Sequence, residues 1–258
     1  GRNIRTLPFR KFDEMFQAVS SGVADAALAP IENSLAGSIH QNYDLMMEHQ
    51  LTIIGEVYLH IVHNLIAIPG ASLEGLRTVY SHPVALAQCA RFFKTNTHIE
   101  AEAAYDTAGS VKMIMENGNP EHGAIAALAA AEVYGGQVIV EGVQDNNANY
   151  TRFLLLAPTA TESCVSLLNP GTEYKTSLVF RVANRPGALF KSLASFALRD
   201  LDLCKIESRP IEGRPWEYSF YLDLKGNATD PALARALGHL DELAESVRVL
   251  GSYPAAQQ

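Results

Sequence analysis

Cysteine is scarce in this chain, and the positions of its three cysteines argue against two kinds of stabilising site. Cys89, Cys164 and Cys204 lie far apart among 258 residues, with no C-x-x-C pair. This pattern disfavours a disulfide framework or a zinc site, so we expect reduced core thiols in a cytoplasmic protein. Long apolar runs are also lacking. No segment approaches the roughly 20 residues of a membrane span, and no secretory signal is visible.

Positive charge is in short supply as well. Lys and Arg number 20 against 28 Asp and Glu, which gives a formal net charge of −8. Nucleic acids and anionic membranes attract proteins with a basic surface, so we expect neither as a partner. A small anionic substrate remains compatible, since a local site can be positive on a negative protein. With 48% hydrophobic and 19% charged residues, this is an ordinary globular sequence, long enough for two domains.

Short apolar runs alternate with helix-period segments through the first 157 residues. Strands are predicted at residues 26–29, 51–57, 59–68, 78–80, 99–103, 124–128 and 153–157, the first of them stopped by Pro30. Helices are predicted at residues 11–20, 38–50, 83–94, 107–116 and 129–134. This alternation predicts an α/β first domain, residues 1–158, built from two lobes. Ligands in such folds bind outside the carboxyl ends of strands, beside helix N-termini.

The pattern changes after this domain. Residues 159–174 are rich in proline, serine and threonine and fit a linker. Residues 175–258 then predict strands and helices at 175–182, 186–199, 203–207, 217–224, 231–246 and 247–250. The order βαββαβ predicts a small α+β module with its helices on one face of an antiparallel sheet.

Polar residues follow the apolar strands at four places. They are Glu32-Asn33-Ser34, Ser81-His82, Asp106-Thr107 and Thr151-Arg152. Together they indicate a pocket for carboxylates and hydroxyls. Taken singly, Ser34, Ser38 and Thr107 are equally good helix N-caps, a role worth only about 1 kcal/mol. The pair His60-x-x-His63 falls on a strand-like segment, where residues three apart face opposite sides, so we expect a structural role and no metal.

Arg152 poses a sharper question, because it stands at the start of the apolar run 153–157. A permanent positive charge in that place must be either solvated by water or paired with an anion. The neighbouring Asn149-Tyr150-Thr151 also fits a glycosylation sequon. We attribute that match to chance, since no secretory signal accompanies it.

Several of these motifs carry a family resemblance. Ala29-Pro30-Ile31-Glu32-Asn33-Ser34, Ser81-His82-Pro83, Asp106-Thr107-Ala108-Gly109 and Asn149-Tyr150-Thr151-Arg152-Phe153 resemble, in order, the motif series of the prephenate dehydratases. Gly187-Ala188-Leu189-Phe190 and Glu207-Ser208-Arg209-Pro210 resemble the phenylalanine-binding motifs of that family's ACT regulatory domain. The resemblance runs across nearly the whole chain. It implies a two-lobed, periplasmic-binding-protein-like catalytic domain followed by an ACT domain.

The resemblance also implies a reaction, in which prephenate loses carbon dioxide and its ring hydroxyl to give phenylpyruvate. Aromatisation drives this step, so no cofactor and no metal are expected. Thr151 matches the family's catalytic threonine, which protonates the leaving hydroxyl. Arg152 is expected to bind a substrate carboxylate through a charge-assisted fork. Asn33, Ser34, Ser81, Thr107 and Phe153 are expected to complete the substrate site.

For the ACT domain, the resemblance implies an effector site for L-phenylalanine. It comprises Gly187, Ala188, Leu189, Phe190, Glu207, Ser208, Arg209 and Pro210. Helix N-terminal amides would bind the effector's carboxylate, and acceptors its ammonium group. Because ACT modules pair their sheets side by side, we expect a homodimer or homotetramer and feedback inhibition.

The chain departs from the family pattern at two places. A first strand and a glycine-containing loop normally precede Lys11, and this chain starts after the place where that loop would lie. Val84 stands where glutamine usually follows Ser-His-Pro. Two alternatives stay open: an arogenate dehydratase with the same chemistry on the aminated substrate, and a non-catalytic amino-acid sensor. The first shares every motif named above.

Overall fold

A computed structural model describes residues 4–159 and 173–256. They divide into two compact units. The first unit contains residues 38–58 together with the described residues up to 32 and from 152 onward. The second contains residues 33–37 and 59–151. Most of the predicted linker, residues 160–172 with Cys164, lies outside the described residues.

The first lobe is built on a four-stranded sheet in the order β2-β1-β9-β3. Its elements are α1 (Phe12–Ser20), β1 (Ala27–Asn33), β2 (Gly37–Ser38), α2 (His40–His49), β3 (Thr52–His60) and β9 (Tyr150–Ala157). Phe16 and Val19 on α1 are completely buried, as their helical spacing predicts. The prediction that Pro30 stops the first strand is wrong, because β1 continues through it to Asn33. The Pro30 carbonyl still accepts a hydrogen bond, from the Asn42 side chain at 2.6 Å.

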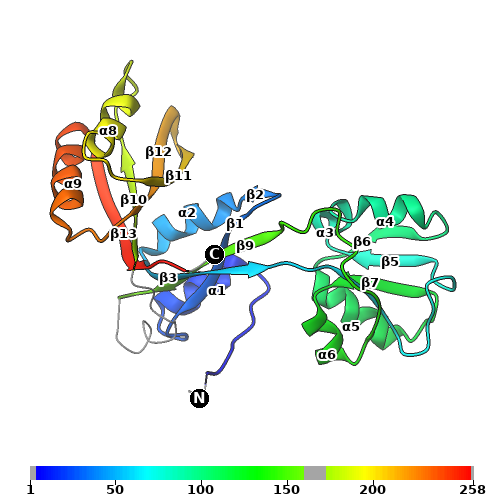
Figure 1. The fold of residues 1–258 in the computed structure, drawn as a ribbon. Helices are drawn as coiled ribbons and strands as arrows, with labels where there is room; N and C mark the ends of the chain where they lie inside the picture. The colour runs from blue at the N-terminus through cyan, green and yellow to red at the C-terminus, as the bar shows by residue number, and fades with distance from the viewer. Residues whose placement is uncertain (1–3, 160–172, 257–258) are drawn as a thin grey trace. The chain divides into compact units, whose positions relative to one another are not determined.

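The second unit is a five-stranded mixed sheet, β6-β5-β7-β4-β8, covered on both faces. Its elements are β4 (Asn64–Ala67), β5 (Thr78–Ser81), α3 (Pro83–Ala87), α4 (Ala90–Thr95), β6 (Glu100–Ala103), α5 (Thr107–Asn117), β7 (His122–Ala126), α6 (Leu128–Tyr134) and β8 (Gln137–Val140). Figure 1 shows α3 and α4 on one side of this sheet and α5 and α6 on the other. A hydrophobic core lies on each face of the sheet, and alternate strand residues point into one or the other. Leu65 and Ile125 face α3 and α4, while Ile66 faces α5 and α6.

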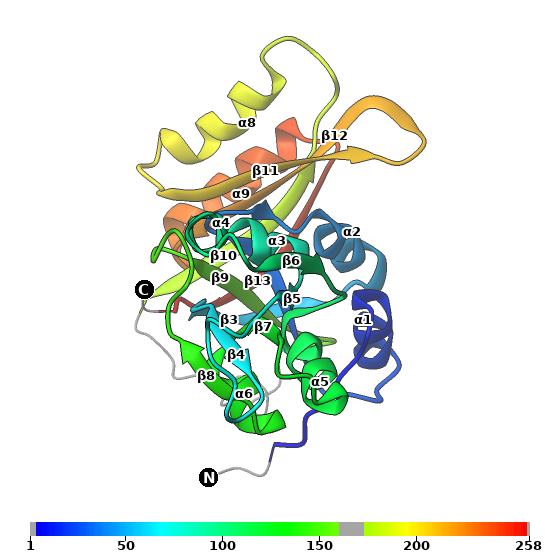
Figure 2. The ribbon, with the colours of Figure 1, turned by 90° about the vertical axis from the view of Figure 1, so that its right-hand side faces the viewer.

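The C-terminal module has the predicted βαββαβ order. Its elements are β10 (Tyr174–Arg181), α8 (Ala188–Ala197), β11 (Leu203–Ile211), β12 (Arg214–Lys225), α9 (Pro231–Leu243) and β13 (Ser246–Pro254). The antiparallel sheet runs β11-β12-β10-β13, with α8 and α9 on one face (Figures 1 and 2). The mixed α/β fold class with a terminal α+β module is thus confirmed.

The other face of the module's sheet packs on the first lobe. Val179, Tyr221, Leu250 and Tyr253 belong to the same buried cluster as Phe16 and its neighbours in the lobe. At Gly251, β13 approaches the backbone of β3 so closely that an added Cβ would meet the carbonyl group of Ile53. The compact units therefore cut across the predicted division at residue 158, because the module and the first lobe share one core.

Several local predictions are wrong for identifiable reasons. The expected helix 83–94 is two short helices separated at Gln88 and Cys89, and the strand β8 was not predicted although Val138, Ile139 and Val140 are apolar and β-branched. None of the proposed caps is used: Ile39 is the N-cap of α2 and Asp106 that of α5. Cys89 is a buried free thiol, and burial raises its pKa to about 12. Cys204 is also free but exposed, so it is not a core thiol.

Two kinds of feature are absent from the residues that the structure describes. None of their helices has both the length and the apolar character that crossing a membrane demands. Among the same residues, no three His, Cys, Asp or Glu side chains are grouped so as to hold a metal ion. His60 and His63 instead make hydrogen bonds to Asn147 and Gln88.

Candidate active site

Asn33, the last residue of β1, is the centre of a polar cluster in the second unit. Its side-chain oxygen accepts hydrogen bonds from the backbone N–H groups of Leu35 and Ala36, at 3.0 and 2.9 Å. These bonds fix the amide orientation, so the Nδ2 group must point the other way. That group donates to Thr151 Oγ1 at 3.0 Å and to Asn149 Oδ1 at 2.8 Å. A turn after β1 thereby orients the donor that holds the threonine hydroxyl.

The Thr151 hydroxyl is placed to lose a proton. Its oxygen accepts the bond from Asn33, so the hydroxyl hydrogen is not used in this contact. A donor aimed at the oxygen also stabilises negative charge there, which favours proton transfer outward. Thr151 as a whole is only 9% exposed, which limits competition from water.

Further side chains, bonded to one another in series, support the pair Asn33 and Thr151. Asn149 is completely buried and donates to Gln88 Oε1 at 3.0 Å. The same oxygen lies 2.9 Å from His63 Nε2. Because an amide oxygen only accepts, this contact places the neutral ring's proton on Nε2 of His63. Asn149 is the residue to which a glycan would be attached, so its burial makes the sequon inaccessible to glycosylation. Sequence reasoning missed Gln88, since an isolated glutamine carries no motif, and it gave His63 only a structural role together with His60.

The other predicted substrate residues differ in their fit. Ser34 is in the cluster, donating to the Ala148 carbonyl at 2.7 Å and accepting from the Tyr150 N–H at 2.9 Å. Ser81 is completely buried and donates to the Ile125 carbonyl at 2.6 Å, so a role in binding substrate does not fit this placement. Thr107 is half-buried in the first turn of α5, and Phe153 is half-buried on β9. The structure brings Asn33, Ser34 and Thr151 together and leaves the others outside this network.

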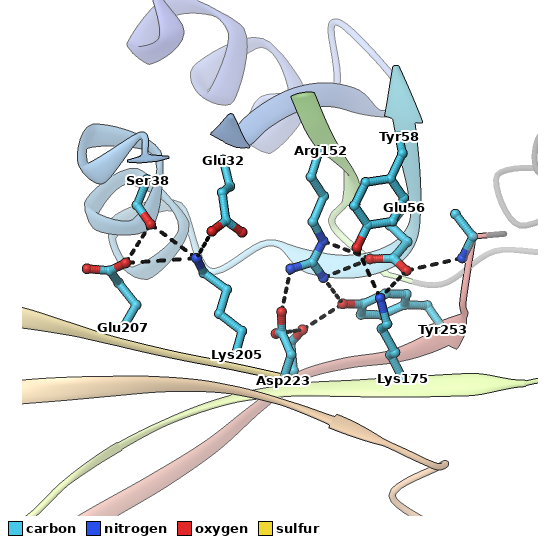
Figure 3. A network of polar contacts seen from close by, with 12 residues as sticks. Glu32, Ser38, Glu56, Tyr58, Arg152, Lys175, Lys205, Glu207, Asp223 and Tyr253 are labelled. Atoms are coloured by element: carbon cyan, nitrogen blue, oxygen red, sulfur yellow. Dashed lines mark hydrogen bonds and ion pairs between the residues drawn. The ribbon is translucent and has the colours of Figure 1, made fainter. Parts of the chain in front are cut away.

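Arg152 is buried in the first unit and already has two anions (Figure 3). Its Nε donates to Glu56 at 2.8 Å, its Nη1 to Asp223 at 2.5 Å, and its Nη2 to the Tyr253 hydroxyl at 3.0 Å. Both edges of the guanidinium group therefore face groups of the protein itself. The expectation that Arg152 binds a substrate carboxylate does not fit this placement. Its partners at residues 56, 223 and 253 are too distant in sequence to be found from a local motif.

Among the described residues of this cluster, positive and negative charges are equal in number. Arg152 and Lys175 supply two cations, and Glu56 and Asp223 supply two anions. Burial by itself lowers the pKa of Arg152, but attraction by Asp223, Tyr253 and Glu56 outweighs that effect and raises the pKa. Burial likewise lowers the pKa of Lys175, but the hydrogen bonds and attraction of Glu56 and Tyr58 together raise it more. Both cations stay charged at neutral pH.

The two predicted effector motifs lie at the start of α8 and on β11. Gly187 has a φ of 78° and directly precedes α8, while Phe190 in its first turn is 76% exposed. On β11, an edge strand, Glu207 and Arg209 face the first lobe. Glu207 accepts a hydrogen bond from Ser38 Oγ at 2.5 Å, and Arg209 forms a two-bond contact with Asp44 on α2. Ser208 and Pro210, on alternate positions, are exposed. The side chains of Glu207 and Arg209 thus contact residues of the same subunit, and their part in effector binding stays a prediction.

Comparison with known proteins decides the family. The family model described as prephenate dehydratase matches residues 1–161. The chain belongs to the prephenate dehydratase family. The Arabidopsis thaliana protein named arogenate dehydratase/prephenate dehydratase 2, chloroplastic, is 44% identical over 98% of this chain and 67% of its own length.

Solved structures agree with this membership. The prephenate dehydratase of Arthrobacter aurescens, solved in complex with L-Phe, is 34% identical and superposes with a TM-score of 0.85, covering 96% of this chain and 81% of that one. GqqA, described as a novel type of quorum quenching acylase, is 36% identical with a TM-score of 0.87, over 97% and 89% of the two chains. The chain spans about two thirds of the length of the curated plant relatives it matches.

One prediction about this family member is contradicted by the comparison. The scarcity and spacing of cysteine led us to expect a cytoplasmic protein. Plant relatives at 41 to 44% identity instead carry chloroplastic names. A stromal protein and a cytosolic one both keep cysteines reduced, so cysteine usage does not separate the two compartments.

Proposed function

We propose that this chain is a decarboxylating dehydratase that acts on prephenate or on its aminated counterpart, arogenate. The ring carboxylate leaves as carbon dioxide, and the electrons of its C–C bond move into the ring. The C–O bond at the opposite carbon breaks, and the departing oxygen takes the Thr151 proton to leave as water. The threonine then regains a proton from solvent. The hydrogen bond from Asn33 to Thr151 Oγ1 carries this proposal, because it stabilises the oxygen from which the proton departs.

The choice between the two substrates concerns only the side chain of the ring, a keto acid in prephenate and an amino acid in arogenate. The plant relatives bear both names. We propose a direct assay of the purified protein with each substrate. The formation of phenylpyruvate or of phenylalanine then identifies the preferred reaction.

Replacing Thr151 with alanine should lower kcat by about 10²- to 10⁴-fold, the range that a positioned proton donor supplies. The fold should persist, since the hydrogen bond lost between Asn33 and Thr151 is worth about 1 kcal/mol. Thr95→Ala is the matched control, because the Thr95 hydroxyl donates to the Arg91 carbonyl of its own helix. A Thr151→Ala protein with full activity would disprove the assignment.

Asn33→Asp refines the same test. Aspartate keeps the oxygen that accepts from Leu35 and Ala36 and loses the donor to Thr151. We expect kcat to fall about 10- to 100-fold, somewhat less than for loss of a full oxyanion donor. Asn119→Asp provides the comparison, since Asn119 closes a similar turn by accepting from the Glu121 N–H. Equal activity of both variants would show that the Asn33 donor has no catalytic part.

The rival interpretation, a non-catalytic amino-acid sensor, makes the opposite prediction. A sensor binds phenylalanine and turns over neither prephenate nor arogenate. The orientation of the Thr151 hydroxyl by a fixed amide favours the enzyme, because a sensor has no need of a stabilised proton donor. Turnover by the wild-type protein that is lost in Thr151→Ala decides between the two.

We also propose that the C-terminal module is an ACT domain that binds phenylalanine and pairs with a second subunit. Two observations support binding: the βαββαβ order of the module, and the L-Phe complex formed by the Arthrobacter aurescens relative. The free edge of β11 supports pairing, because an exposed edge strand offers unpaired backbone groups to a second sheet. A homodimer or a homotetramer follows, which light scattering distinguishes.

Gly187→Ala should weaken inhibition by phenylalanine without removing catalysis. The positive φ of 78° strains any L side chain, by about 1–3 kcal/mol, and so shifts the turn before α8. We expect the half-inhibitory phenylalanine concentration to rise about 10-fold or more, as that strain converts to affinity. Gly213→Ala has the same strain, φ 73°, in the β11–β12 turn and should leave inhibition unchanged. Equal inhibition in both variants would place the effector elsewhere.

A further inference from the structure

The chain passes between its two compact units at four points. These lie after residues 32, 37, 58 and 151. The first-unit residue at each point has its side chain bound by the C-terminal module. Glu32 is 2.9 Å from Lys205 Nζ, Ser38 donates to Glu207 at 2.5 Å, Tyr58 accepts from Lys175 at 3.2 Å, and Arg152 donates to Asp223 at 2.5 Å. Figure 3 shows these contacts as two groups.

The first group surrounds Lys205 of β11. Its ammonium group, on a side chain only 12% exposed, contacts Glu32 and donates to Ser38 Oγ at 3.1 Å. Glu207 holds the same serine and accepts from His40 at 3.2 Å. Glu32 and Ser38 bracket the five residues 33–37 that carry Asn33. The module thus fixes both ends of the segment that supplies the donor to Thr151.

The second group is the balanced cluster around Arg152. Arg152 follows Thr151 on β9, and adjacent strand residues point to opposite faces of the sheet. The two side chains therefore cannot both reach the same small substrate from one side. A further carboxylate beside Arg152 would also leave the buried cluster with a net negative charge. Both facts remove Arg152 from substrate binding and leave it as an anchor for the backbone of Thr151.

We propose that Arg152 and Lys205 are positioning residues through which the C-terminal module sets the hydrogen bond between Asn33 and Thr151. Arg152 fixes the strand that carries the hydroxyl, and Lys205 fixes the segment that carries the amide. Turnover then depends on the module even without any effector. The inference rests on the proposed catalytic part of Thr151.

The test compares Arg152→Lys and Lys205→Met in the full chain. Lysine cannot make the two-edged contact of arginine, and methionine keeps an unbranched stem without the charge. We expect kcat to fall about 10- to 100-fold while KM changes less than about 3-fold, the pattern of a misplaced catalytic group. Lys225→Met is the matched control, because Lys225 forms an exposed pair with Asp202 on the same sheet and should change neither constant. Lys205→Arg, which retains the charge, should recover most of the loss.

Two outcomes would overturn the inference. A KM that rises about 10-fold or more with kcat retained would show that Arg152 binds substrate. Full kcat in a folded Lys205→Met protein would show that the β11 contacts do not position the site. Failure of the proposed function looks different: the wild-type protein turns over neither substrate, or Thr151→Ala keeps full activity.

Amide hydrogen exchange tests whether residues 33–37 and Thr151 are held in place, without any measurement of turnover. The backbone amides of residues 33–37 and of Thr151 should exchange faster in Arg152→Lys and Lys205→Met than in Lys225→Met. The amides of α5, in the same unit but away from these contacts, should not change and serve as an internal reference. Unchanged exchange at Thr151 and 33–37 would refute the inference, whichever reaction the protein catalyses.

Discussion

Gly251→Ala should destabilise the first unit by about 3 kcal/mol or more, at the upper end of what overpacking costs. The added Cβ would stand 2.9 Å from the carbonyl carbon of Ile53 and closer still to its oxygen. The obstacle is backbone, so no side-chain rotation relieves it. Relief requires β13 to move away from β3, and that movement opens the core that Leu250 and Tyr253 share with the first lobe.

Urea unfolding followed by far-ultraviolet circular dichroism measures this loss. Gly238→Ala is the matched control, since Gly238 lies within α9 and nothing lies within 4 Å of its Cβ position. That substitution should stabilise the protein by up to about 1 kcal/mol, because alanine favours helix over glycine. The same glycine-to-alanine substitution is thus expected to lower the free energy of unfolding at residue 251 and to raise it at residue 238. A Gly251→Ala protein as stable as the wild type would show that the module does not dock through this backbone contact.

Helices and strands could be predicted from the sequence where the spacing of apolar residues along the chain determines them. The apolar period of α1 and the βαββαβ order of the module could be predicted because one buried face recurs at fixed intervals. The break between α3 and α4 could not, since Gln88, where α3 ends, is bonded to His63 and Asn149, which are distant in the sequence. Likewise, nothing near Pro30 in the sequence reveals that β1 continues through it to Asn33.

The candidate site also has a part that local motifs predict and a part that depends on residues distant in the sequence. Asn33, Ser34 and Thr151 stand in contiguous motifs, and the structure gathers them. Arg152 belongs to the same motif, yet its partners come from β3, β12 and β13. A charge beside a catalytic group suggests an anionic ligand when only the sequence is known. Only the fold shows that the protein supplies the anions itself.

Arg152→Met should destabilise the fold by about 3–5 kcal/mol, the usual effect of removing one partner from a buried ion pair. Glu56 and Asp223 would then share only Lys175, which leaves one uncompensated negative charge among side chains at most 12% exposed. Arg214→Met, which breaks an exposed pair with Glu217, should lose about 1 kcal/mol or less in the same urea titration. Similar losses in the two variants would mean that the guanidinium group of Arg152 is not buried as described.

The double variant Arg152→Met with Asp223→Asn separates charge from position. It leaves Lys175 opposite Glu56, a neutral pair 2.7 Å apart, so most of the lost stability should return. The asparagine can still accept from Ser177, which donates to Oδ1 of Asp223 in the wild type. Turnover should not return with stability, because the contact that fixed the strand beside Thr151 is still absent. Recovery of both together would show that Arg152 acts only as a stabilising charge, whereas recovery of stability alone identifies the strand position as what the module provides.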